Sequence, residues 1–200
     1  MTRVTCHMSM SLDGFVAGPD QSLEAGLGVG GIEVHRWHLP PNPTHEADVA
    51  AAAELLRPMG AYLMGRNMFS PTRGPWTDDW RGWWGDEPPY HAPVFILTNH
   101  EREPVEMAGG TTFHFITEGF DAALARAREV AGDMDVDIAG GASTVRQAFA
   151  AGAIDDLYLD IAPVLLGRGE SMFDGIPLVA LTQQSVTYSP DEIHVHYTVG

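Results

Sequence analysis

The chain has 200 residues, of which 44% are hydrophobic and 19% are charged, values typical of a globular protein with one core. Its formal net charge is −16 and all eleven basic residues are arginine, which disfavours nucleic acid and anionic membranes as partners and excludes Schiff-base chemistry on a lysine. Cys6 is the single cysteine, which excludes an internal disulfide and a thiolate metal cluster. Because the sequence has neither an apolar run of about 18 residues nor a signal-peptide pattern, we expect a cytoplasmic protein outside the membrane.

The first half of the chain is predicted to alternate strands and helices. An apolar run at 3–11 predicts a strand, and 44–57 predicts a helix whose buried face holds four residues, Val49, Ala52, Ala53 and Leu56. A short apolar strand is expected at 60–65. The segment 71–93 holds four of the five tryptophans among many Gly and Pro residues. We expect this segment on the surface, over a pocket or at a subunit contact.

The second half continues the alternation and then changes character. It predicts two strands, a helix and a strand–turn–helix–strand unit, at 94–99, 111–117, 120–132 and 135–167. In the helix, Leu124, Ala127 and Ala131 recur at helical spacing. Period-two patterns at 184–189 and 192–199 predict an antiparallel hairpin. These elements predict a single domain over 1–200 with an α/β fold and a mostly parallel sheet.

The most informative local motif is a glycine turn between a strand and a helix. In 137-DIAGGAST-144, Gly140 and Gly141 let the backbone approach a phosphate, and the start of a helix attracts an anion. Ser143 and Thr144 add hydroxyl donors. A tight turn that binds nothing explains the same pattern, so both interpretations stay open.

Two other predicted strands also end in residues suited to phosphate binding. Gly65 is followed by Arg66, whose guanidinium can make two hydrogen bonds to a phosphate, and Thr98 and Asn99 follow another strand. In an open α/β sheet, ligands bind at the carboxyl ends of the strands. The three ends together therefore predict one site for an extended phosphorylated cofactor.

Five stretches in order along the chain resemble the dihydrofolate reductase-like superfamily. They are SLDG at 11–14, LMGRNMF at 63–69, ILTN at 96–99, IAGGAST at 138–144 and DDLYLDIAPVLLGRG at 155–169. Within the superfamily, the chain is most similar to the reductase domain of the bifunctional riboflavin-biosynthesis deaminase/reductase. The resemblance implies a three-layer α/β/α fold, NADPH as cofactor and, commonly, a homodimer. It implies a reductase of a small heterocyclic or carbonyl substrate of riboflavin-pathway or pterin type.

The resemblance also assigns roles to individual residues. It implies that the pyrophosphate lies on Gly140, Gly141, Ala142, Ser143 and Thr144. It places Gly65, Arg66, Leu97, Thr98 and Asn99 around the adenosine half of the cofactor, with Arg66 near the 2′-phosphate. It places Ser9, Ser11 and the segment from Phe15 to Gly18, including Val16 and Ala17, on the nicotinamide side.

Asp13 is the candidate catalytic residue, because in riboflavin-type reductases the SLDG segment lies beside the reaction centre. It could orient substrate or a proton-carrying water; a carboxylate before a glycine is also a common turn former. True dihydrofolate reductases place an acidic residue after a Trp-x-Leu-Pro stretch, where 37-WHLPPN-42 has Asn42. Folate is therefore not the expected substrate.

Two alternatives to a reductase remain open at this point. One is a protein of the same fold that has lost catalysis and acts as a nucleotide-binding or dimeric interaction protein. The other is a hydrolase that uses Asp13 and a histidine. No metal site is expected, because His35, His38, His194 and His196 have no acidic or cysteine partner at ligand spacing in the sequence.

Overall fold

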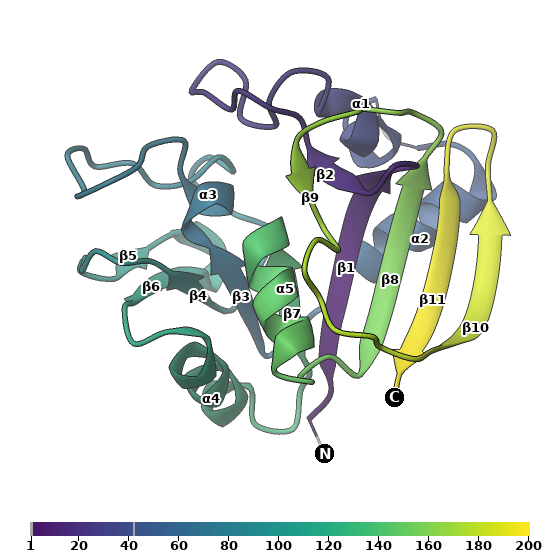
Figure 1. Ribbon diagram of the computed structural model, residues 1–200. Coiled ribbons are helices and arrows are strands. Elements are labelled where there is room, and N and C mark those ends of the chain that lie inside the picture. Colours follow the sequence, from purple (N-terminus) through teal and green to yellow (C-terminus); the bar gives the residue numbers. More distant parts are fainter. Residues whose placement is uncertain (1, 42) are drawn as a thin grey trace.

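One nine-stranded sheet forms the centre of the protein in a computed structural model that describes residues 2–41 and 43–200 (Figure 1). Asn42 lies outside the described residues. The strand order is β10-β11-β8-β1-β7-β3-β4-β6-β5, and β2 and β9 form a separate two-stranded sheet. The strands are β1 (Val4–Ser11), β2 (Phe15–Ala17), β3 (Ala61–Gly65), β4 (Pro93–Leu97), β5 (Val105–Glu106), β6 (Thr112–Ile116), β7 (Val136–Gly140), β8 (Asp156–Ala162), β9 (Glu170–Ser171), β10 (Leu181–Tyr188) and β11 (Ile193–Val199).

The direction of the strands matches the predicted mostly parallel sheet. The pairs β1–β7, β1–β8, β3–β7, β3–β4 and β4–β6 are parallel, whereas β10–β11, β8–β11 and β5–β6 are antiparallel. The predicted hairpin is β10 and β11, joined at Ser189, whose amide donates to Glu192 O. The predicted fold class is confirmed.

Helices lie on both faces of this sheet (Figure 1). They are α1 (Ile32–His35), η1 (Arg36–His38), α2 (Glu46–Leu55), α3 (Arg66–Phe69), η2 (Ala108–Gly110), α4 (Phe120–Ala131) and α5 (Ala142–Ala150). On one face α4 and α5 bury the predicted residues Leu124, Ala127 and Ala131 against the alternate side chains of β1, β3 and β7. On the other face α1 and α2 cover β1, β8, β10 and β11. None of the helices in the described ranges is long and apolar enough to cross a membrane.

The Trp-rich segment 71–92 fills a second hydrophobic cluster. Trp76, Trp80 and Trp84 pack against Phe69 and buried side chains of β3, β4 and β6. Trp80 also donates from Nε1 to Phe69 O at 2.7 Å. These tryptophans are therefore partly buried against the core, although the segment that carries them has no regular secondary structure.

The predicted buried face of the helix at 44–57 is wrong. Val49 is 48% exposed and Leu56 is 62% exposed, and Ala53 is also exposed. The residue of α2 that is buried is Asp48, at 4% exposure, because its carboxylate pairs with a histidine of β11. A polar contact, rather than the apolar stripe, sets the rotation of this helix.

Candidate functional site

The carboxyl ends of four neighbouring parallel strands meet at one edge of the sheet. In the order β1, β7, β3 and β4, they end at Ser11, Gly140, Gly65 and Leu97. This edge is at the top of the sheet in Figure 1, where α3 and α5 begin. The sheet order thus brings together the strand ends that the sequence predicts as a cofactor site.

In the turn from β7 into α5, no side chain caps the first backbone N–H groups of the helix. The peptide bond between Gly140 and Gly141 is cis, and Gly140 has a φ of 118°. Gly141 is the N-cap of α5 and has no side chain to accept from the first helical amides. A Cβ added at Gly141 would meet nothing within 4 Å. The geometry suits an anion, because free N–H groups at a helix start attract negative charge.

Gly65 and Thr144 bring β3 against the start of α5. A Cβ on Gly65 would lie 2.7 Å from Thr144 Oγ1, so the close approach needs a glycine. Thr144 itself is 1% exposed and its amide donates to Gly141 O at 2.9 Å. Ala142 is buried as well, whereas Ser143 is exposed. Of the predicted pyrophosphate residues, the Gly141 backbone and Ser143 are therefore the accessible ones.

Arg66, the next residue after β3, is buried without a partner. It is 8% exposed, and Nε, Nη1 and Nη2 lack a hydrogen bond in the described part of the chain. Its guanidinium lies 3.5 Å from the centroid of the Trp76 ring. Burial, and then repulsion by Arg73 and Arg102, outweigh the attraction of Asp78 and lower the pKa of Arg66. A buried cation without an anionic partner is costly, so the arrangement suits an incoming anion.

A hollow of about 470 Å³ lies beside Trp76. It is lined by Pro75, Trp76, Asn99, His100, Glu101 and Thr117. Asn99 is exposed, and Thr98 is 9% exposed with its Oγ1 accepting from the His100 amide at 3.2 Å. Of the predicted adenosine residues after β4, Asn99 therefore faces the hollow, whereas Thr98 holds the turn. Leu97 is partly buried against the core.

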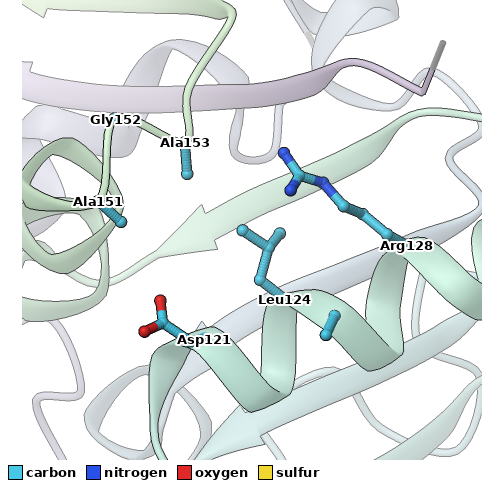
Figure 2. A pocket seen from close by; sticks show the side chains of 7 residues that line it. Asp121, Leu124, Arg128, Ala151, Gly152 and Ala153 are labelled. Atoms are coloured by element: carbon cyan, nitrogen blue, oxygen red, sulfur yellow. The ribbon is translucent and has the colours of Figure 1, made fainter.

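A second hollow, of about 280 Å³, lies away from these strand ends. Figure 2 shows it between α4 and the turn after α5, with Asp121 and Arg128 on its wall. It borders the C-terminal end of α5, whereas the candidate site borders the N-terminal end. None of the predicted site residues lines it.

The predicted nicotinamide side is closed in this structure. Ser9 is 6% exposed and its Oγ accepts from Trp37 Nε1 at 3.0 Å. Ser11 is fully buried, and its hydroxyl donates to Asp13 at 2.6 Å. Val16 and Ala17 are 6% and 4% exposed, and a Cβ on Gly18 would lie 1.9 Å from Val29 O. The roles of these residues toward a nicotinamide stay predictions.

Asp13 lies at the centre of a loop contact. Beyond Ser11, its carboxylate accepts from the amides of Leu166 at 3.1 Å and Gly167 at 2.7 Å. The Ser11 hydroxyl first, and then these backbone donors, lower the pKa of Asp13. Asp13 is therefore an ionised, exposed carboxylate that fixes the loop after β8. It is suited to hold a position and unsuited to donate a proton.

The structure also brings forward two residues that the sequence did not single out. Arg102 lies beside Trp76 and Arg66, and Thr117 lines the hollow. The excess of tryptophan in 71–92 was the available signal for Trp76. For Arg102, which follows Asn99 in a loop, the sequence offers no local signal.

Comparisons with known proteins agree with this geometry. The family model of the RibD C-terminal domain matches residues 2–195. A protein from Shewanella sp. PV-4 that is named for riboflavin biosynthesis has a TM-score of 0.66 and 20% identity, over 100% of this chain and 99% of that one. RibD from Acinetobacter baumannii has a TM-score of 0.59 and 17% identity, over 100% and 58%. The riboflavin biosynthesis reductase Rib7 from Saccharomyces cerevisiae has 0.57 and 14%, over 100% and 90%.

These structures establish the dihydrofolate reductase-like fold of the chain. No curated protein sequence matches it.

Proposed function

Because the chain belongs to the RibD C-terminal domain family, a family of riboflavin-pathway reductases, we propose that it is an NADPH-dependent reductase. Its proposed substrate is a small heterocyclic or carbonyl compound of riboflavin-pathway or pterin type. The proposal agrees with the position of the candidate site at the carboxyl ends of parallel strands, where α/β folds bind nucleotides.

One observation carries the cofactor assignment. A buried guanidinium without a partner, Arg66, and an uncapped helix start, that of α5, follow neighbouring strands β3 and β7. Each favours an anion, and a dinucleotide phosphate presents anions at both its pyrophosphate and its adenosine end. The residues present therefore fit NADPH, with the Gly141 turn at the pyrophosphate and Arg66 at the adenosine phosphate.

When bound, NADPH supplies the hydride, and the chain supplies position and charge. We propose that Asp13 is a positioning residue. Its carboxylate accepts from Leu166 N and Gly167 N, and this contact fixes the loop after β8 beside the end of β1. In the variant Asp13→Asn the loop loses a charged acceptor, so we expect KM for substrate to rise while the pH dependence of kcat keeps its shape. A pH profile that loses its acidic limb would instead assign proton chemistry to Asp13.

The experiment begins with binding and proceeds to turnover. NADPH and NADH are titrated by fluorescence and by thermal unfolding, and we expect NADPH to bind and to raise Tm. NADPH consumption is then measured with folate, pterin and ribosylaminopyrimidine substrates, of which folate is expected to be inactive. Lack of binding of either dinucleotide at millimolar concentration would contradict the proposal.

One observation favours a second candidate, a nucleotide-binding protein of the same fold without catalysis. The hydroxyls of Ser9 and Ser11 already have hydrogen-bond partners within the protein, and Val16–Gly18 are buried. These groups are therefore not free to contact a nicotinamide. Tight NADPH binding without turnover of any of the three substrate classes would support this second candidate.

The expected homodimer also stays a prediction. All eight residues of the edge strand β10 are exposed, and this strand is a surface on which to test association. Analytical ultracentrifugation of the wild type and of Val186→Arg measures it, since a dimer that pairs through β10 should dissociate in the variant.

A further inference from the structure

We propose that the imidazoles of His35 and His38 form an acid-sensitive latch, which keeps the segment 32–38 closed over the predicted nicotinamide side of the site. The latch itself does not depend on the proposed function, whereas its assignment to the nicotinamide side rests on that function. The two histidines are three residues apart in the sequence, and the proposed function gives them no role.

Two hydrogen bonds in series join α1 and η1 to β2. His35, the last residue of α1, has its Nε2 atom 2.9 Å from Val16 O, and its Nδ1 atom lies 3.4 Å from Nε2 of His38. Because a carbonyl oxygen can only accept, Nε2 of His35 carries a hydrogen, and Nδ1 of the neutral ring accepts from His38. A proton on Nδ1 of His35 would remove this acceptor. The two bonds together therefore need a neutral His35.

The latch closes the base of a long loop. Val16 lies in β2 and His35 in α1, so their hydrogen bond joins the two ends of the loop 18–31, and α1 lies beside β2 (Figure 1). Two backbone hydrogen bonds within the loop, both 2.8 Å long, hold it as one body. No side chain caps the first turn of α1, which has only four residues, and so short a helix is not stable by itself. The segment therefore depends on its contacts with the rest of the protein.

The latched segment covers groups that are predicted to face the nicotinamide. Trp37 lies between the two histidines in the chain, and its Nε1 donates to Ser9 Oγ at 3.0 Å. The carbonyl of Val16 is bound by His35. Release of the latch frees this carbonyl and loosens the cover of Ser9. Val34 and Trp37 are buried and keep the segment near the sheet, so the opening is local.

The latch is closed at neutral pH and opens in acid. Burial lowers the pKa of His35, and burial and then the neighbouring His35 lower the pKa of His38 from 6.5 to about 4. The closed segment therefore binds protons less tightly than the open one. The contribution of the latch is fully present above about pH 6.5, and it is lost as pH falls through the lowered pKa values toward about pH 4.

The charges that face the pair come from two strands. Asp160 of β8 attracts a proton to both rings, whereas His7 of β1 repels one from His38. Asp160 is itself bound to His7 at 2.8 Å. From α2 the facing charge is Asp48, which is bound to His194, and β2 has no titratable side chain. The acid sensitivity is therefore expected from the two rings of the latch.

The test is amide hydrogen exchange of the cofactor-free protein at pH 7 and pH 5. Protection factors are compared, because they remove the pH dependence of the exchange chemistry itself. We expect the protection of residues 18–38 to fall about 10- to 30-fold at pH 5, the ratio that a change in pKa from 6.5 to about 4 gives. Peptides of α4 and β3 should keep their protection.

Three variants separate the two histidines from other causes. His38→Gln keeps an N–H donor toward His35 but takes up no proton, so its protection should change less than about threefold between the two pH values. His35→Ala removes both bonds, so the segment should lose about 5- to 10-fold in protection already at pH 7. The matched control is His114→Gln on β6, which removes another histidine whose pKa is lowered by burial and should follow the wild type. Thermal unfolding of each variant verifies that it is folded.

The assignment to the nicotinamide side is tested by stopped-flow binding of NADP⁺ at pH 7. The association rate constant should rise at least about threefold in His35→Ala, because the segment no longer has to open before the nicotinamide enters. An unchanged rate constant would overturn this assignment.

The exchange measurement decides the latch itself. Equal protection of the wild-type segment at both pH values would overturn it, and so would an acid loss of protection that remains in His38→Gln. A loss that α4 and β3 share would show acid unfolding of the protein instead of a latch. If NADP⁺ does not bind to the wild type, the proposed function fails, and the exchange result still stands.

Discussion

Two buried polar clusters lie on the same face of the sheet, and they differ in whether their groups have partners. In the first, Asp160 accepts from His7 at 2.8 Å and from His194 at 2.7 Å, and His194 reaches Asp48 at 2.9 Å. We call these four residues the histidine–aspartate cluster. In the second, the guanidiniums of Arg66 and Arg102 lie on Trp76 with buried nitrogens that have no acceptor.

The difference separates a structural role from a binding role. Paired buried charges join elements, and the histidine–aspartate cluster joins β1, β8, β11 and α2. Unpaired buried charges destabilise the free protein, so their presence points to a ligand that supplies the missing charge. Variants that remove a group from each cluster should therefore differ in whether they lose stability or ligand binding.

The largest effect on stability is expected from Asp160→Ala. The change removes the acceptor of both His7 and His194, which are 8% and 7% exposed. Loss of one member of a buried, hydrogen-bonded charge network costs about 3–5 kcal/mol. Urea unfolding measures the free energy, with the exposed Asp174→Ala as the control. A loss below about 1 kcal/mol, the value for an ordinary surface pair, would contradict this role.

The variant Arg66→Met should lose ligand binding and keep its stability. It removes an unpaired buried cation and keeps the apolar stem on Trp76, so the free energy of unfolding should stay the same or rise by about 1 kcal/mol. NADPH affinity should nevertheless fall about 100-fold, as measured by titration. A variant that is strongly destabilised would show that Arg66 stabilises the fold through contacts other than a bound phosphate.

The pH dependence of stability should be set by the histidine–aspartate cluster and its neighbour Glu192. Burial lowers the pKa of His194, but its hydrogen bonds to Asp160 and Asp48 outweigh this and raise it above the ordinary 6.5. Burial, and then Asp160 and Asp48, raise the pKa of Glu192 from 4.5 to about 9. His194 and Glu192 therefore both bind a proton more tightly in the folded protein than in the unfolded chain. Their contributions are therefore fully present below the unfolded pKa values and are lost as pH rises through the folded ones.

The contributions of these two groups should accordingly be lost between about pH 4.5 and pH 9. The variant Glu192→Gln cannot lose this proton, so its stability should fall less steeply between pH 6 and pH 9 than that of the wild type. The contribution of Asp160 to stability depends on pH in the opposite direction. Its pKa is lowered, because the hydrogen bonds from His194 and His7 outweigh burial, and its contribution is lost as pH falls through the folded pKa. Identical profiles for the wild type and Glu192→Gln, in unfolding measured across this range, would contradict the assignment.

The smallest expected effect is that of Trp37→Phe. Trp37 packs edge-on against His194 at a centroid distance of 4.9 Å and donates to Ser9. The variant keeps an aromatic ring but loses one hydrogen bond, so we expect a loss of about 1 kcal/mol. Unchanged NADPH affinity in the same variant would agree with a structural role for Trp37 beside the histidine–aspartate cluster.

Much of the fold and part of the candidate site could be predicted from the sequence. Strand ends such as Gly140 and Gly65 carry local signals, because a glycine at a strand end lets the backbone approach another group closely. Parallel strand order then brings these ends together. The contacts of Arg66 with Trp76 and Arg102 depend on the path of an irregular segment, which no periodicity specifies.

The histidine–aspartate cluster was missed for a related reason. Its members lie far apart in the sequence, so that His7 and Asp160 are separated by 153 positions and His194 and Asp48 by 146. The absence of acidic partners near the histidines along the chain therefore says nothing about partners across the sheet. The same contact turned α2 so that Asp48, rather than Val49 and Leu56, became buried.

A crystal structure of the protein with NADP⁺ at saturating concentration tests the central claim most directly. We predict the 2′-phosphate within hydrogen-bond distance of Arg66, and the pyrophosphate on the Gly141 turn at the start of α5. An NADP⁺ molecule bound elsewhere, with the Arg66 guanidinium still lacking an anionic partner, would contradict the account.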